Sequence, residues 1–448
     1  MKLSSLYRHL AGLKSVFLSS LIVLTLLIPG CQKIDFWDNI NNHSHGKGPD
    51  ARVAIDWYRL QMGLLLERNS TLFGPHVAYI GIGLYESVQP GLKNSVSLSG
   101  ILYQMPVMPA IEKNKGYDWQ VSANAALASL IRYFNIGLTP ANMATIDSLE
   151  NAYNQKLMNG AGSEKFMRSQ AFGRSVATAV HNWSLTDNFN PSNAGYVPPM
   201  FPGAWVPTPP AFLNGINPYI SSSRPLLASI AGNVAGPVSV AYSEDPNSDF
   251  YKMVENVYTV SKNLTQEQKD IAMFWVDQGN GTGFTPHGHH ISIITQVLYQ
   301  KHADLGTAAE AYAKGGIAER ESTIICFRSK YTYNLIRPVS YIQKVIDPTW
   351  LPFIPTPPHP EYPAAHAFIT GSVTSAVEKV LGEHLRMTDH TYDFRGWKAR
   401  TYNSLFDAGK EAGISRLYGG IHYLPSINTG LMLGRNLGQK IGNLKLHY

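Results

Sequence analysis

The strongest constraint on the fold is the spacing of the apolar residues, which repeats at helical intervals over most of the chain. Within residues 51–67, for example, Trp57, Leu60, Leu64 and Leu65 recur as on one face of a helix. Further helices are expected over residues 77–88, 122–134, 140–153, 166–183, from 249 and from 266 onward, and over 291–303, 307–327, 367–381, 405–417 and 430–444. Segments with strand-like alternation are scarce. The sequence therefore predicts an all-α fold, either two fused four-helix-bundle-like units or one large bundle.

Residues 190–226 interrupt this pattern with nine prolines and several aromatic residues. No helix tolerates that proline density, because each proline removes a backbone donor and clashes with the preceding turn. The aromatic residues argue against a loose linker. We expect a long ordered loop that either covers the core or forms the wall of a cleft.

The charge content is low and nearly balanced. Only 15% of the 448 residues are charged, and 37 Lys and Arg against 31 Asp and Glu leave a formal charge of +6. Removing residues 1–30 removes Lys2, Arg8 and Lys14 and leaves 34 basic against 31 acidic residues, or +3. That balance does not favour a nucleic-acid partner. Two cysteines exclude a disulfide-stabilised scaffold, and Cys326 is expected in the core.

The N-terminus reads as an export signal. A basic start is followed by an apolar run from Val16 to Ile28 and by Pro29-Gly30-Cys31. This segment resembles a bacterial lipobox, although Pro29 is unusual there, which implies cleavage before Cys31 and lipid on its thiol. Gln32 after the cysteine favours the outer membrane. An uncleaved anchor or a plain secretory signal is the alternative.

The chain therefore divides into four expected parts. These are a signal peptide (1–30), a polar tether (31–50), an N-terminal helical region (51–250) and a C-terminal helical region that carries the site (251–448). The only expected membrane contact is the lipid, and the oligomeric state stays open.

Three C-terminal blocks hold the candidate chemistry. They run from Lys330 to Arg337-Pro338, from His359 to Pro363-Ala-Ala-His366, and from Ser415-Arg416 to His422. Two guanidiniums and an ammonium suit an oxyanion that carries several negative charges. A histidine near each end of the cluster suits a nucleophile or metal ligand and a general acid.

The ordered set Lys-x6-Arg-Pro, Pro-x-x-His and Ser-Arg-x5-His resembles the signature shared by vanadium-dependent haloperoxidases and type 2 phosphatidic acid phosphatases. The helical N-terminal half and the segment from Trp205 to Pro210 resemble the longer, secreted bacterial haloperoxidase-like branch. The resemblance implies that His422 binds vanadium or attacks phosphorus. Lys330, Arg337, Arg416 and the backbone N–H of Ala365 would hold the oxyanion, and His366 would be the acid–base group. Vanadate, or phosphate as a substrate group, would occupy the site.

The same resemblance implies a halide side. His359 stands at a position that is histidine in many bromide- and iodide-oxidising members and aromatic in chloride oxidisers. Phe327 stands where haloperoxidases often have tryptophan. The alternative for His359 is a surface residue that flanks a helix.

Two positions depart from the family pattern. Ala364 replaces a serine that normally bonds an oxyanion oxygen, which costs about 1.5–3 kcal/mol of anion affinity. Ser426 replaces an aspartate four residues after the covalent histidine. A serine there orients the ring but does not stabilise an imidazolium as a carboxylate does. The loss of the aspartate counts more against a phosphatase than against a peroxidase.

Other motifs leave alternatives open. Asp277 is either a partner of Arg337 or Arg416, or a solvent-facing aspartate. The segment from Thr285 to His290 contains three histidines and is either a turn near the cleft or, less in keeping with its tight geometry, a zinc site. The glycine-rich residues 279–283 lack a phosphate-loop pattern.

The first functional expectation is thus an enzyme that oxidises iodide or bromide with hydrogen peroxide. The second is an acid phosphatase that hydrolyses phosphate esters through a phosphohistidine. The third is an oxyanion-binding protein without turnover.

Overall fold

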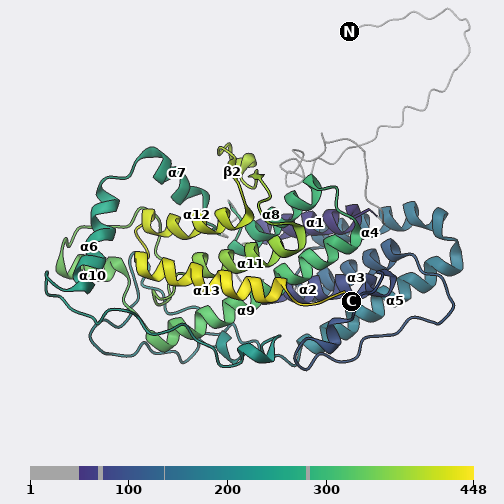
Figure 1. Cartoon of the computed structure of the whole chain (residues 1–448), viewed down its shortest axis with the longest axis horizontal. Helices are drawn as coiled ribbons and strands as arrows, with labels where there is room; N and C mark the ends of the chain where they lie inside the picture. Colours follow the sequence, from purple (N-terminus) through teal and green to yellow (C-terminus); the bar gives the residue numbers. More distant parts are fainter. Residues whose placement is uncertain (1–49, 69–73, 136, 279–282, 448) are drawn as a thin grey trace, which may run out of the picture. The chain divides into compact units, whose positions relative to one another are not determined.

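The computed structural model describes residues 50–68, 74–135, 137–278 and 283–447 (Figure 1). The expected all-α class is confirmed, because these residues form α-helices and one short antiparallel pair of strands, β1 (Met387–Asp389) and β2 (Arg400–Tyr402). The helices, in chain order, are α1 (Arg52–Arg68), α2 (Gly74–Val88), α3 (Trp119–Phe134), α4 (Pro140–Ala161), α5 (Ser163–Ser184), α6 (Asp249–Lys262), α7 (Gln266–Phe274), α8 (Pro286–Gln300), α9 (Leu305–Tyr333), α10 (Pro338–Val345), α11 (Ala365–Leu381), α12 (Leu405–Tyr418) and α13 (Leu424–Gly442).

The predicted signal peptide, the tether and Cys31 lie outside the described residues, so lipid attachment stays a prediction. Among the residues that the structure describes, no helix is long and apolar enough to cross a membrane. Cys326 is fully buried, as expected for a core residue.

Most helices begin at a side chain that caps them. Thr139 accepts the backbone N–H of Asn142, whose side chain bonds back to Thr139, and Thr265 makes the same capping box with Gln268. Asp304 caps α9, and Asn334 ends it in the left-handed conformation with φ 44°. These short-range signals explain why most helices were predictable.

Several differences from the predicted helices lie around the candidate site, while α4 also runs past its predicted end at Tyr153 to Ala161. Helix α10 was not predicted, because it is only eight residues long and begins at Pro338 directly after Arg337. Helix α8 begins at Pro286, before the predicted start at Ile291, because Thr285 caps it. The strand pair was also missed, since three-residue strands carry no readable alternation.

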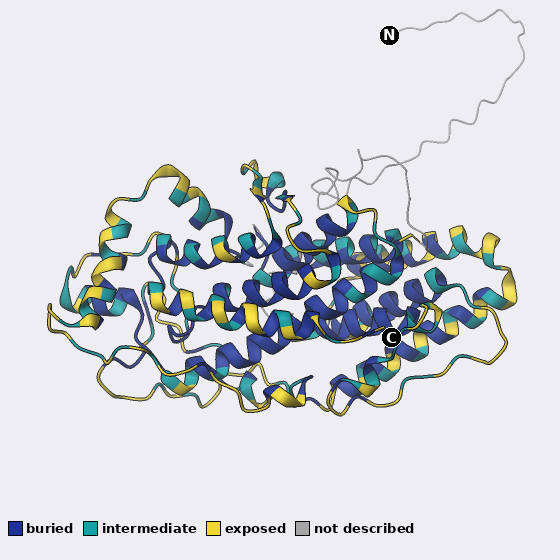
Figure 2. Cartoon of the chain, in the orientation of Figure 1, coloured by how far each residue is buried: buried dark blue, intermediate teal, exposed yellow. Residues whose placement is uncertain are grey.

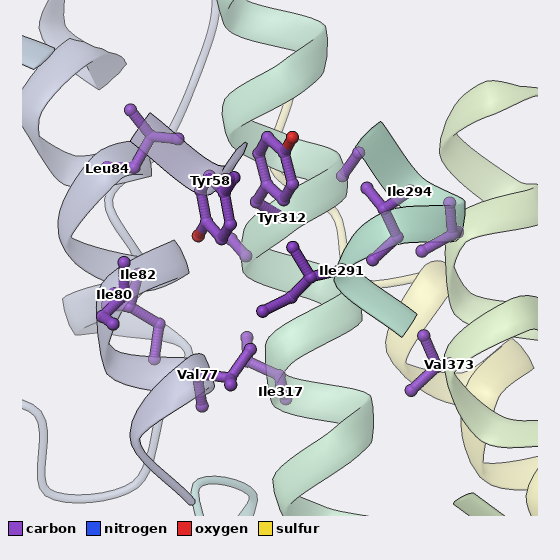
Figure 3. Close-up of a cluster of buried hydrophobic side chains, with 14 of the residues drawn as sticks. Tyr58, Val77, Ile80, Ile82, Leu84, Ile291, Ile294, Tyr312, Ile317 and Val373 are labelled. Atoms are coloured by element: carbon purple, nitrogen blue, oxygen red, sulfur yellow. The ribbon is translucent and has the colours of Figure 1, made fainter. Parts of the chain in front are cut away.

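The largest core cluster draws side chains from both sides of residue 250 (Figure 3). The rings of Tyr58 in α1 and Tyr312 in α9 stack with centroids 3.5 Å apart. Asp187 and Arg320 form a buried ion pair at 2.8 Å across the same division. The domain boundary expected at 250 stays a prediction, but the core does not stop there.

Helix α11 packs against α9, α12 and α13, and most of its length is buried (Figure 2). Glycines make the close approach of α13 possible. A Cβ on Gly434 would lie 2.3 Å from the carbonyl oxygen of Phe368, and one on Gly438 would lie 2.2 Å from that of Ser372. The N-terminal half of α11 is therefore held by backbone-to-backbone packing against α13.

The proline-rich residues 190–226 contain no α-helix, as expected, and only a short 3₁₀ turn at Ile220–Ser222. The loop is ordered against the helices. Trp205 is fully buried, and Ala204 bridges to Leu335 just after α9.

Candidate functional site

A cavity of about 430 Å³ opens where three helix ends meet the proline-rich loop. The N-termini of α8 and α11 and the turn from α12 to α13 border it, and most of its remaining wall is apolar. Ile216 and Ile220 of the loop line it. The loop is thus a cleft wall, which is one of the two roles expected for it. The volume is in the range of small-molecule sites.

His422 lies on this wall, in the turn that follows Gly420, a glycine with φ 76°. Its Nδ1 atom is 2.7 Å from Oε1 of Glu361, and its Nε2 atom is 3.1 Å from Nη1 of Arg337. Burial lowers the pKa of His422 well below its usual value, and Arg337 and Lys330 lower it further. The imidazole is therefore neutral near pH 7.

Glu361 is the residue that sequence reasoning missed. It is fully buried and accepts the backbone N–H of Tyr423 at 3.0 Å in addition to its contact with His422. Burial raises the pKa of Glu361 to about 7, while Lys330 and Arg337 oppose the rise. The available signal was an acidic residue inside the apolar, proline-rich segment between His359 and Pro363.

Ser426 does not contact the ring of His422 directly. Its hydroxyl donates to Oε2 of Glu361 at 2.9 Å. The expectation that His422 lacks a carboxylate is therefore wrong, because Glu361 reaches the ring from another segment of the chain.

Lys330 and Arg337 face acceptors of the chain itself and are not among the cavity-lining residues. The ammonium of Lys330 donates to the carbonyl oxygens of Pro360, Glu361 and Pro363 at 3.0, 2.9 and 2.6 Å. Arg337 donates to the carbonyl oxygens of residues 357, 359 and 421 as well as to two histidine rings. Burial lowers the pKa of Lys330 to about 8 and that of Arg337 to about 10. The structure thus shows both cations anchoring the segment 357–363 beneath the cavity.

Arg416 is the guanidinium that lines the cavity. Its Nε atom donates to Oγ of Ser415 at 3.0 Å, and its Nη2 atom donates to the carbonyl oxygen of Trp275. Burial lowers the pKa of Arg416 to about 10, and Asp277 opposes this. These two acceptors fix the position of the Arg416 guanidinium.

The N-terminus of α11 reaches the same wall through Ala365 and His366. Ala364 occupies the N-cap position and offers no side-chain acceptor, so the first backbone N–H groups of this 17-residue helix lack a side-chain cap. An uncapped N-terminus carries a partial positive charge and favours an anion. The backbone N–H of Ala365 lies at this terminus, and its contact with an oxyanion stays a prediction.

His366 and Asp277 form the next pair. Nε2 of His366 lies 3.2 Å from Oδ2 of Asp277, though the two atoms are not well directed for a hydrogen bond. Oδ1 of Asp277 accepts the hydroxyl of Tyr392 at 2.7 Å and lies 2.8 Å from Nδ1 of His289. Burial, together with the charge of Arg416, lowers the pKa of His366 to about 4, while Asp277 opposes this.

Of the two expectations for Asp277, the solvent-facing alternative is wrong, and the partnership with Arg416 is electrostatic, without a hydrogen bond. Its side chain is 1% exposed, so it does not face solvent. Within the described part of the chain it makes no hydrogen bond to Arg337 or Arg416, although it lies close enough to Arg416 to affect the pKa of that group. Asp277 instead joins His366 to a buried network, and its φ of 44° is one cost of that placement.

His359 and Phe327 stand on the same side of the cavity, with ring centroids 5.3 Å apart. His359 is 6% exposed, so the surface alternative is wrong. Its Nδ1 atom lies 3.0 Å from Nη2 of Arg337 and 3.1 Å from the carbonyl oxygen of Pro360. Burial holds the pKa of His359 well below its usual value.

The segment from Thr285 to His290 is the capped start of α8, at the edge of the cavity. His287 and His290 both contact the carboxylate of Glu319, and His289 lies between Asp277 and Asp389 at 2.8 Å from each. Within the described ranges, no group of His, Cys, Asp and Glu is arranged to hold a metal ion. The segment lies at the cavity as expected, but it begins a helix and does not form a turn, while residues 279–282 lie outside the described residues.

The assembled donors suit a small tetrahedral oxyanion such as vanadate or phosphate. Arg416 and an uncapped helix N-terminus face the cavity, two more cations lie buried behind it, and a neutral imidazole borders it. The carboxylates of Glu361 and Asp277 balance only part of this charge. Added negative charge would therefore be stabilised here.

Comparison with known proteins gives two kinds of match. Residues 310–447 match the family model described as the VCPO second helical-bundle domain. No curated protein matches the sequence.

Solved structures are similar over most of the chain. The crystal structure of the first bacterial vanadium-dependent iodoperoxidase is 29% identical, with a TM-score of 0.78, and the match covers 90% of this chain and 98% of that chain. The holo form of a bacterial vanadium-dependent chloroperoxidase is 15% identical, with a TM-score of 0.59 over 84% and 94%. Its apo form is also 15% identical, with a TM-score of 0.60 over 83% and 93%. At 15% identity these last two show the fold alone.

Proposed function

The chain has the fold of the vanadium-dependent haloperoxidases, and we propose that it oxidises iodide or bromide with hydrogen peroxide when vanadate is bound. The observation that carries the proposal is His422. Its Nε2 atom faces the guanidinium of Arg337, which only donates, so Nε2 carries a lone pair. His422 also borders a cavity whose other polar groups favour an anion, and an anion bound at Nε2 would take the place of the Arg337 donor.

Each residue has a distinct part. His422, Arg416 and the backbone N–H of Ala365 would hold vanadate directly, and bound vanadate would activate the peroxide as an electrophile. Lys330 and Arg337 add positive potential from behind and fix the segment that carries His359 and Glu361.

His366 is the proton-transfer group. Its Nε2 atom faces Asp277, and with a pKa of about 4 the ring is neutral near pH 7. A neutral imidazole beside a carboxylate can accept a proton from a bound reactant and return it. The apolar side chains around it, among them Ile354 and Ile421, limit water in the cavity.

Iodide or bromide is the proposed halide for two reasons. A neutral, buried histidine stands at position 359, where the resemblance predicts histidine for these halides. The similar bacterial protein at 29% identity is an iodoperoxidase.

The test uses purified protein incubated with orthovanadate, peroxide and iodide, with triiodide followed by absorbance. We expect turnover above that of free vanadate and a fall to the free-vanadate rate in His422→Ala. The matched control is His447→Ala, because His447 is an exposed histidine that contacts Glu310 and is not among the residues that line the cavity. Wild-type protein that does no better than free vanadate would refute the proposal.

A phosphatase is the second candidate, and one observation favours it. The carboxylate that supports a phosphohistidine is present after all, because Glu361 contacts Nδ1 of His422. Hydrolysis of an aryl phosphate that vanadate inhibits would support this candidate. Binding of vanadate or phosphate with neither activity would leave the third candidate, an oxyanion-binding protein.

A further inference from the structure

The carboxylate of Glu361 is surrounded by donors. Oε1 accepts the backbone N–H of Tyr423 and lies 2.7 Å from Nδ1 of His422, while Oε2 accepts the hydroxyl of Ser426. In its ionised form, Glu361 accepts hydrogen bonds on both oxygens and is an acceptor toward the ring as well. The proton between Glu361 and His422 therefore belongs to Nδ1.

The contact at the second ring nitrogen gives the same assignment independently. The guanidinium of Arg337 can only donate, and its Nη1 atom lies 3.1 Å from Nε2 of His422. Nε2 is therefore the unprotonated nitrogen. Two neighbours from different segments thus select one tautomer, with the proton on Nδ1 and the lone pair on Nε2.

The segment that carries Glu361 is itself held in place. The backbone N–H of Glu361 donates to the carbonyl oxygen of Leu335, and the carbonyl oxygen of Glu361 accepts a hydrogen bond from Nζ of Lys330, both at 2.9 Å. The side chain is fully buried. A carboxylate fixed at both backbone and side chain has little freedom to leave the imidazole.

We infer that Glu361 is the positioning residue for His422 and supplies, from the segment before α11, the carboxylate that the sequence pattern places at position 426. It holds the Nδ1–H tautomer, which leaves the Nε2 lone pair for the central atom of an oxyanion. It also opposes the positive charge that the ring gains when Nε2 shares that pair. This inference rests on the oxyanion site of the proposed function but not on turnover.

The first test measures the tautomer in the wild-type protein. ¹⁵N-histidine labelling and NMR distinguish protonated from unprotonated ring nitrogens, and the His422→Gln variant assigns the signal. We expect a protonated Nδ1 and an unprotonated Nε2. An Nε2–H tautomer in the wild type would overturn the inference, and this result needs no substitution at Glu361.

The second test measures oxyanion affinity by calorimetry with orthovanadate and with inorganic phosphate. Replacing the outer partner of a ligating histidine typically costs about 10–100-fold in affinity, and we expect Glu361→Gln to fall in that range with a mixed tautomer. Adding Ser426→Asp to Glu361→Gln should restore part of the affinity, because it places a carboxylate on the same side of the ring.

The matched control is Glu319→Gln. Glu319 is an equally buried carboxylate that contacts two imidazoles, His287 and His290, on the wall of the same cavity. This variant should leave the tautomer of His422 unchanged. Equal affinities and tautomers in wild type and Glu361→Gln would contradict the inference. Oxyanion binding without iodide oxidation would refute only the proposed peroxidase. The oxyanion affinity and the tautomer of His422 would still test the role of Glu361.

Discussion

At the scale of single residues, the site depends on which acceptor each cation faces. Lys330 and Arg337 have the spacing of oxyanion ligands, yet in this structure they bond carbonyl oxygens of the segment 357–363. Arg416 alone among the three lines the cavity. In the proposed function, the direct anion contacts are thus divided among Arg416, His422 and the N-terminus of α11, and Lys330 and Arg337 act from behind.

Ala364 permits a direct test of that division. It is the N-cap of α11 and is fully buried, so Ala364→Ser places a hydroxyl where it can bond either the oxyanion or the helix backbone. We expect orthovanadate affinity to rise about tenfold or more, as a charge-assisted hydrogen bond of about 1.5–3 kcal/mol implies. Calorimetry measures the orthovanadate affinity, and thermal unfolding measures how much a capping hydroxyl stabilises the protein. A higher melting temperature with unchanged affinity would show that the hydroxyl only caps the helix.

At the scale of elements, buried carboxylates connect helices to turns. Glu86 in the last turn of α2 is 3% exposed and accepts the backbone N–H of Leu98 and the hydroxyl of Ser97. Burial raises its pKa to about 7, above the ordinary value of 4.5. The folded protein therefore holds a proton on Glu86 more tightly than the unfolded chain does.

This difference predicts a pH-dependent stability. The contribution of Glu86 is fully present below pH 4.5 and is lost as the pH rises through 7, because the folded state must then bury a charge. Glu86→Gln removes the charge, keeps an oxygen that accepts from Leu98, and offers an amide N–H that can donate to the hydroxyl oxygen of Ser97. Chemical denaturation measures the free energy of unfolding. Between pH 4.5 and 7, that of the variant should increase relative to that of the wild type, by up to about 3 kcal/mol. A difference that does not change with pH would contradict the raised pKa.

The contact between α11 and α13 predicts a second effect at this scale. Gly438→Ala would press a methyl group against the carbonyl oxygen of Ser372 and push the helices apart. We expect a loss of about 1–3 kcal/mol of stability, together with weaker oxyanion binding, because α11 carries Ala365 and His366. Thermal unfolding and calorimetry measure the two effects.

Gly160 in α4 provides the control for this substitution. A Cβ there would meet nothing within 4 Å, so Gly160→Ala should stabilise the protein by up to about 1 kcal/mol. If both alanine variants behaved alike, close packing of α11 on α13 would not be the cause.

At the scale of the whole molecule, the core joins the N-terminal helices to the region that carries the site. Helix α2 packs along α9, and a Cβ on Gly81 would lie 2.4 Å from the carbonyl oxygen of Tyr312. The buried pair of Asp187 and Arg320 and the stack of Tyr58 on Tyr312 cross the same contact. Helix α9, which carries Lys330, therefore buries one face against residues before 250.

A chain reduced to residues 251–448 should thus fail to fold alone. Removing the partners of α9 would expose its apolar face and leave Arg320 without Asp187. Near-ultraviolet circular dichroism and denaturant titration of the fragment measure this. A cooperative unfolding transition in the fragment would show that the C-terminal region is an independent domain, as the expected boundary at 250 implies.

The sequence by itself determined the helical class, the proline-rich loop as an ordered segment, and the three blocks that hold Lys330 with Arg337, His366, and Arg416 with His422. These depend on short-range signals: apolar spacing, capping residues, proline density and motif spacing. Only the tertiary structure decided which groups meet. Glu361 reaches His422 across 61 positions, Asp277 turns to His366 and His289, and Lys330 turns to backbone carbonyls. Such contacts arise because a buried charge must find a partner wherever the packed core brings one within reach, and sequence spacing does not record that distance.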